Sequence, residues 1–132
     1  MTSPNLDLVR SIYADWERGD FSRSDWAAPE INYVAADGPE PGTCVGLPGM
    51  AEFVGAALSA FEHASIQADE YHDLDCERVL VLDHFIGRSK TSGVDLGQMG
   101  TREAHLFHIR RGNVTRLVRY LDRALADLGL EE

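Results

Sequence analysis

Two basic residues, His105 and Arg119, each lie in a stretch of alternating residue types that is typical of a β-strand. His105 alternates with Glu103 and Phe107, and Arg119 alternates with Leu117, so each side chain projects toward one face of its strand. An imidazole titrates near neutral pH and can pass protons, whereas a guanidinium keeps its charge and can stabilise an enolate or hold a carboxylate. If both face one cavity, they form an anion-tolerant site. The alternative is that His105 hydrogen-bonds a neighbour in a polar core and Arg119 pairs with an acid, either Glu103 or Asp37.

The strand before them also carries a histidine. His84 shares a strand face with an apolar set that we expect to line a concave surface, namely Leu80, Leu82 and Ile86. It is either a second polar group in the cavity or a satisfied histidine of the core or of an interface. The intervening residues Val79, Val81 and Phe85 are then expected on the outer face, where they favour self-association as a homodimer.

The sequence predicts no metal and no cofactor. His105 and His108 are separated by an odd number of residues on a strand and face opposite sides, so they cannot bind one ion together. The other acids and histidines lack a ligand pattern. Phosphate-binding loops, dinucleotide fingerprints and nucleophile elbows are not found in the sequence either.

These candidates depend on an α+β fold, with helices first and strands later. Apolar spacing predicts a first helix from Leu6 to Trp16 and a third helix over 50–61, and the position of Pro29 predicts a short helix or turn over 24–28 before it. Period-two alternation predicts strands over 31–36, 65–72, 78–90, 102–110 and 114–122, followed by a helical turn over 124–128. We therefore expect a single domain, 1–132, in which a curved antiparallel sheet wraps around the N-terminal helices as a cone-shaped α+β barrel.

A sheet that curls over helices encloses either a filled core or a cavity. Large side chains of these elements are candidates for the pocket wall, although such residues build cores more often than they bind ligands. The predicted lining consists of Trp16, Tyr13, Trp26, Tyr33, Phe53, Leu82, His84, Glu103 and Phe107.

Composition narrows the possible partners and the compartment. The net charge of −10 disfavours nucleic-acid binding, which needs a clustered basic surface. The N-terminus lacks signal-peptide features and no apolar run is long enough to cross a bilayer, so we expect a cytoplasmic chain with no membrane partner. Cys44 and Cys76 suit free thiols in a reducing compartment better than a disulfide.

Three segments of the chain resemble the nuclear transport factor 2-like superfamily. IYADWERGD at 12–20 looks like the exit of its first helix, and GLPGMAEF at 46–53 looks like its loop into the long helix. The run at 111–125 is similar to the last hairpin strand of its SnoaL-like branch, which is related to polyketide cyclases and ketosteroid isomerases. The resemblance covers nearly the whole chain and implies the cone-shaped fold and a homodimer. It is weak evidence for function because one fold hosts many activities.

The resemblance also implies roles for individual residues. Asp37 matches the isomerase general base, nine residues before Gly46, although an aspartate that opens a Gly/Pro loop also suits an Asx turn. His105 falls where the isomerase has an acid and SnoaL-like cyclases have a histidine. Arg119 stands where the cyclase aspartate is found, and Ile12, beside Tyr13, stands where the isomerase has a tyrosine. These two departures weaken both mechanisms.

Together these observations predict a protein with a pocket for a small hydrophobic molecule. As an enzyme it would be a cofactor-free isomerase, cyclase or dehydratase that transfers protons on a hydrophobic carbonyl compound, using His105 and Asp37 as acid and base and Arg119 as charge stabiliser. The alternative is a non-enzymatic ligand-binding or dimeric interaction module.

Overall fold

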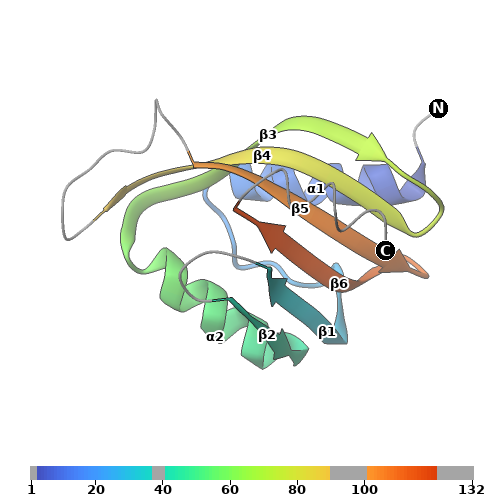
Figure 1. The fold of residues 1–132 in the computed structure, drawn as a ribbon, viewed down its shortest axis with the longest axis horizontal. Coiled ribbons are helices and arrows are strands. Elements are labelled where there is room, and N and C mark those ends of the chain that lie inside the picture. The colour runs from blue at the N-terminus through green and yellow to red at the C-terminus, as the bar shows by residue number, and fades with distance from the viewer. Residues whose placement is uncertain (1–2, 37–40, 90–100, 122–132) are drawn as a thin grey trace.

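The computed structural model describes residues 3–36, 41–89 and 101–121. An N-terminal helix and a six-stranded curved sheet form most of the molecule, with a second helix between the second and third strands (Figure 1). The elements are α1 Pro4–Glu17, β1 Ala27–Ala35, β2 Gly42–Val45, α2 Gly46–Leu58, β3 Phe61–Asp73, β4 Arg78–Ser89, β5 Thr101–Arg110 and β6 Asn113–Tyr120. The predicted α+β class is confirmed.

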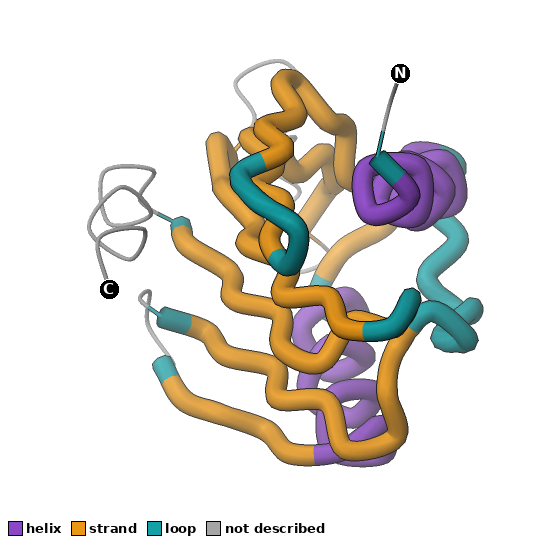
Figure 2. Tube along the Cα trace, turned by 90° about the vertical axis from the view of Figure 1, so that its right-hand side faces the viewer, coloured by secondary structure: helices purple, strands orange, loops and turns teal. Residues whose placement is uncertain are grey.

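The sheet is mixed and open, with the strand order β2-β1-β6-β5-β4-β3. Neighbouring strands are antiparallel except β1 and β6, which run parallel. The prediction of a wholly antiparallel sheet is therefore wrong for this one pair. Helix α1 packs against β3 and β4, and α2 packs against β1 and β2, so both helices lie on one side of the curve (Figure 2). No helix in the described ranges is long and apolar enough to span a membrane.

Helix α1 forms where the sequence predicts it. The Ser3 hydroxyl accepts a hydrogen bond from the Leu6 amide at 3.0 Å, and Pro4 takes the first turn, where no N–H donor is required. The apolar stripe buries Val9, Ile12 and Tyr13 completely. The helix therefore presents the Tyr13 side chain to the sheet.

Two predicted segments end earlier than expected. The short helix or turn predicted over 24–28 is a turn at 25–26, because β1 begins at Ala27 and contains Pro29. Pro29 lies where the register with β6 shifts between Ala27 and Asn32, so its missing N–H breaks no regular ladder. The second helix ends at Leu58, and Phe61 belongs to β3, where its ring packs against Phe85 at 4.9 Å. Strand β2 was not predicted because it is short, and the helical turn over 124–128 lies outside the described residues.

The predicted faces of β4 are reversed. Val79, Val81 and Phe85 pack in the main core beneath the helices, whereas Leu80 and Leu82 belong to a separate cluster on the opposite face. Alternation shows that residues two apart share a face but not which face is covered, and both faces of β4 are apolar. We call the face toward the helices the inner face and the opposite one the outer face. The core residues cited for self-association are therefore not on the outer face.

The outer face has its own apolar cluster. Its buried members come from three adjacent strands: Leu80 of β4, Ala104 and Leu106 of β5, and Val118 and Tyr120 of β6. The hairpin of β5 and β6 that aligns them turns at Arg111 and Gly112, which have positive φ values of 54° and 79°. This pair of left-handed residues matches the twist of a two-residue hairpin.

Candidate functional site

A cluster of buried polar side chains lies on the inner face of β4 and β5. Asp83 and Glu103 are cross-strand partners, and His105 is the next inward residue along β5. The Nδ1 atom of His105 is 2.7 Å from Asp83 Oδ2, and the hydroxyl of Tyr13 donates a hydrogen bond to the same oxygen. Asp83 and Tyr13 are fully buried, while Glu103 and His105 are 5% and 2% exposed. Helix α1 and two strands thus converge on one carboxylate.

The surroundings of His105 favour its charged form. Burial alone would lower the pKa of the imidazole, but the Asp83 charge, its hydrogen bond and the Glu103 charge outweigh burial and the opposing Arg119 charge. The net result is a pKa for His105 above its ordinary value. Burial, followed by the charge and hydrogen bond of Asp83, raises the pKa of Tyr13 well above its usual range, so Tyr13 stays a neutral donor.

Arg119 lies beside this cluster. It is the cross-strand partner of His105 on β6, and its own β1 neighbour is Ala35. Its Nε atom is buried and has no hydrogen-bond partner in the described part of the chain. Burial raises the pKa of Tyr33 to about 12, and the charge of Arg119 acts in the opposite direction. The inner face therefore holds two carboxylates, a histidine and a guanidinium in neighbouring positions.

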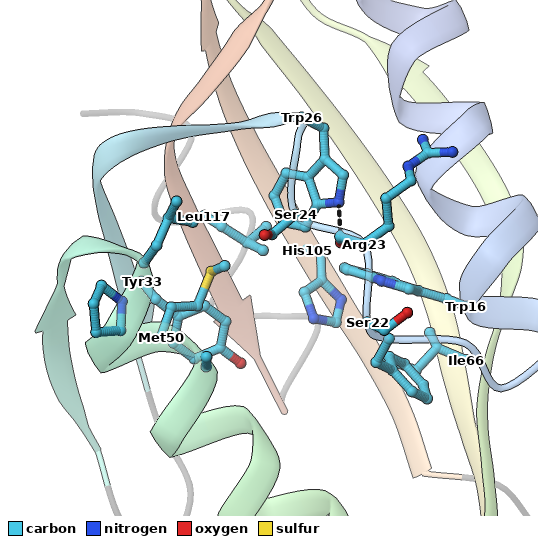
Figure 3. Close-up of a pocket in the computed structure, with 14 residues that line it drawn as sticks. Trp16, Ser22, Arg23, Ser24, Trp26, Tyr33, Met50, Ile66, His105 and Leu117 are labelled. Carbon is cyan, nitrogen blue, oxygen red and sulfur yellow. Dashed lines mark hydrogen bonds between the residues drawn. The ribbon is translucent and has the colours of Figure 1, made fainter.

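The ring of His105 also lines a pocket of about 350 Å³ (Figure 3). Aromatic residues from three elements form much of its wall, with Trp16 from α1, Trp26 from the turn before β1, and Tyr33 from β1. The remaining lining comes from 21–24, the first turns of α2, and the sheet: Phe21, Ser22, Arg23, Ser24, Leu47, Pro48, Met50, Ala51, Ile66 and Leu117. A mostly apolar wall that includes one buried imidazole suits a small, mostly hydrophobic ligand.

The predicted site residues divide into four groups. Trp16, Trp26, Tyr33 and His105 line the pocket. Tyr13, Glu103 and Phe107 are buried on the inner face, and Phe53 packs against Tyr33 with ring centroids 5.6 Å apart. Leu82 and His84 are not in the lining: Leu82 packs in the outer cluster, and His84 Nδ1 lies 3.0 Å from Asp69 Oδ1. Asp37 lies outside the described residues.

Sequence reasoning missed Asp83 as a member of the site. The available signal was a carboxylate inside an apolar strand, on the same strand face as Val79, Val81 and Phe85. Because these residues were predicted to lie on the outer face, Asp83 was not considered as a partner of His105. The error in strand face and the missed residue therefore have one cause.

The same cluster could hold a metal ion. One ligand atom from each of Asp83, Glu103 and His105 lies within 4.8 Å of the others. Two carboxylates and an imidazole suit a divalent cation such as Zn²⁺ or Mn²⁺. In this structure, however, Asp83 Oδ2 accepts one hydrogen bond from the Tyr13 hydroxyl and is paired with His105 Nδ1, so these atoms are engaged with one another.

Comparison with known proteins identifies the fold. No protein-family model matches the chain, and no curated protein is significantly similar to it in sequence. Among solved structures, TerC co-crystallised with polyporic acid is 20% identical, with a TM-score of 0.76 over 98% of this chain and all of its own. An NTF2-like protein from Burkholderia thailandensis E264 is 21% identical, with a TM-score of 0.76 over 98% of both chains. A structure from Jannaschia sp. CCS1, assigned to the SnoaL-like polyketide cyclases, is 14% identical, with a TM-score of 0.74 over 95% of this chain and 89% of its own. The chain therefore has the fold of the NTF2-like proteins, which it shares with SnoaL-like and ketosteroid isomerase-like structures.

Proposed function

We propose that this protein binds a small hydrophobic carbonyl compound in the aromatic pocket and transfers a proton to or from it through His105. One observation carries the proposal: His105 lines the pocket while its Nδ1 atom is held 2.7 Å from a fully buried carboxylate. Because Nδ1 faces Asp83, we assign the contact with the ligand to the other ring nitrogen, Nε2. A proton donor at that position can stabilise the oxygen of a carbonyl as negative charge develops.

Arg119 supports the same chemistry from the neighbouring strand. It is paired with His105 in the register, and its permanent charge favours an enolate near the cluster. Asp37 remains a prediction for the base that removes the carbon-bound proton. TerC, which shares this fold, was crystallised with polyporic acid, and this is consistent with a pocket for a small molecule.

The test of catalysis is isotope exchange. A panel of hydrophobic ketones is incubated with the protein in D₂O, and deuterium incorporation next to the carbonyl is followed by NMR. His105→Ala should slow exchange by about 100-fold or more, because a positioned acid or base contributes 10²–10⁴-fold. His108→Ala is the matched control, since His108 is on the same strand but faces the outer side. Exchange by His105→Ala within threefold of the wild type would refute the role of His105.

The pocket itself is tested separately. Ala51 is an exposed residue of α2 that lines the pocket, so Ala51→Trp should block ligand entry at a cost in stability of about 0.5 kcal/mol or less. Quenching of the fluorescence of Trp16 and Trp26 measures ligand binding. Ala56→Trp, at an exposed position of the same helix away from the pocket, is the control. Equal ligand affinity in the two variants would show that binding occurs elsewhere.

A non-enzymatic ligand-binding role is the second candidate. It is favoured because the pocket wall offers few groups for acid–base chemistry. His105 is the one histidine among the described lining residues, and the Arg23 guanidinium is paired with Asp15 at 3.2 Å and with Asp25 at 3.0 Å. Saturable binding without isotope exchange or product would establish this role. The homodimer is also a proposal, and light scattering should give twice the 14.6 kDa mass of one chain.

A further inference from the structure

One oxygen of Asp83 joins α1 to the candidate site. Asp83 Oδ2 accepts the hydrogen bond from the Tyr13 hydroxyl and also lies 2.7 Å from His105 Nδ1. Tyr13 is fully buried, and its ring packs edge-on against Trp16, with centroids 4.9 Å apart. Trp16 in turn lines the pocket and contacts the His105 ring at 5.7 Å. The tyrosine thus lies behind the histidine and does not line the pocket.

We propose that Tyr13 is a positioning residue for His105: by donating to the shared Asp83 oxygen, it fixes the carboxylate and keeps His105 from binding its proton too tightly. This inference rests on the proposed function for its catalytic meaning. The hydrogen-bond arrangement itself does not depend on any substrate.

The physical reason is a difference between two protonation states. When His105 is protonated, its charge and its Nδ1–H both stabilise the Asp83 carboxylate. When His105 is neutral, the carboxylate depends more heavily on the Tyr13 donor. Removing the Tyr13 hydroxyl therefore destabilises the state with neutral His105 more than the state with protonated His105. The pKa of His105 should rise as a result.

Other groups around His105 affect its proton affinity in both directions, and a substitution at Tyr13 removes none of them. Glu103 on β5 favours the protonated ring, and Arg119 on β6 opposes it. Tyr33 on β1 and Arg23 in the loop before β1 line the pocket, and Tyr71 on β3 packs against Tyr13 with ring centroids 5.9 Å apart. A shift that follows loss of the Tyr13 hydroxyl alone can thus be assigned to the shared carboxylate.

The experiment is a histidine titration by ¹⁵N NMR on the full chain, without ligand. In Tyr13→Phe, the His105 midpoint should rise by about one pH unit, a tenfold gain in proton affinity, because hydrogen bonds to charged groups are among the strong ones. Tyr71→Phe is the matched control. Tyr71 is half-buried and packs against the Tyr13 ring, so loss of its hydroxyl should leave the His105 midpoint unchanged. An unchanged or lowered midpoint in Tyr13→Phe overturns the proposal.

A second measurement covers the case in which Tyr13→Phe does not fold. Replacing Tyr13 alone by 3-fluorotyrosine makes its phenol a stronger donor with little change in shape, so the His105 midpoint should fall. A midpoint that rises or stays constant contradicts the role of Tyr13. If the midpoints shift as expected but no ketone exchanges deuterium, the proposed catalysis fails while the positioning role stands. If His105→Ala abolishes exchange but the His105 midpoint does not respond to changes at Tyr13, the positioning role fails while the proposed catalysis stands.

Discussion

The inner and outer faces of β4, β5 and β6 are both buried, but they are buried with different chemistry. On β5, Glu103 and His105 point inward to Asp83, while the intervening Ala104 and Leu106 point outward into an apolar cluster. Burial of hydrocarbon stabilises the fold in proportion to area, whatever the pH. Burial of charge stabilises it only while each group keeps its partner and its protonation state. The stability contributed by the polar cluster of the inner face should therefore depend on pH, whereas that of the outer cluster should not.

The largest effect should come from breaking the inner cluster. Asp83→Ala removes the partner of both His105 and Tyr13, and we expect the free energy of unfolding to fall by about 3–5 kcal/mol. Urea denaturation measures this loss. Asp83→Asn keeps the shape and a hydrogen-bond acceptor, so it should cost less. Equal stability of Asp83→Ala and the wild type would show that the buried charges are not coupled to the fold.

The outer face should respond to volume alone. Leu106 is 3% exposed, so Leu106→Ala should cost about 2–4 kcal/mol through lost burial and a cavity. The cost should be the same at pH 6 and pH 9, because no titratable contact is removed. A cost that changes by more than about 1 kcal/mol between these pH values would mean that the two faces are not independent.

The pH dependence of stability should be specific to the inner face. The folded pKa of His105 lies above its ordinary value of 6.5, so its contribution is complete below about pH 6.5 and is lost as pH rises through the folded value. The stability difference between the wild type and His105→Gln should therefore shrink between pH 6 and pH 9. The change is about 1.4 kcal/mol for each unit by which the folded pKa exceeds 6.5. A difference that grows with pH would contradict the assigned direction.

The smallest effect is a contrast between two histidines of β5. The pKa of His105 is raised, whereas burial and the charges of Arg116 and Arg78 lower the pKa of His108. Their NMR titration midpoints should therefore lie on opposite sides of the ordinary value. Arg116→Gln removes one of the opposing charges and should move the His108 midpoint upward by a few tenths of a unit without moving that of His105. Coincident midpoints would show that the two faces do not differ in electrostatics.

Local patterns predicted most elements because their causes are local. The Ser3 cap, Pro4 and the apolar stripe of α1 act within a few residues. The alternation in 65–72 and 102–110 indicates a strand whichever neighbour that strand pairs with. The short helix or turn predicted over 24–28 is a turn that ends at Trp26. Its end was placed too late because Pro29 was interpreted as a boundary, although β1 includes Pro29 at a register shift. The parallel pairing of β1 with β6 joins residues 84 to 87 positions apart, and no local signal indicates it.

The sequence by itself determined the α+β class and the spacing of most strands, and it singled out His105 as a candidate, because residue type and periodicity are properties of the chain. Only the tertiary structure decided which face of β4 turns inward, since a strand that is apolar on both sides fits either orientation. That decision brought Asp83 rather than Leu82 or His84 to His105, and it set the Tyr13 hydroxyl behind them. The site depends on contacts between residues 22 and 70 positions apart, which only packing can specify.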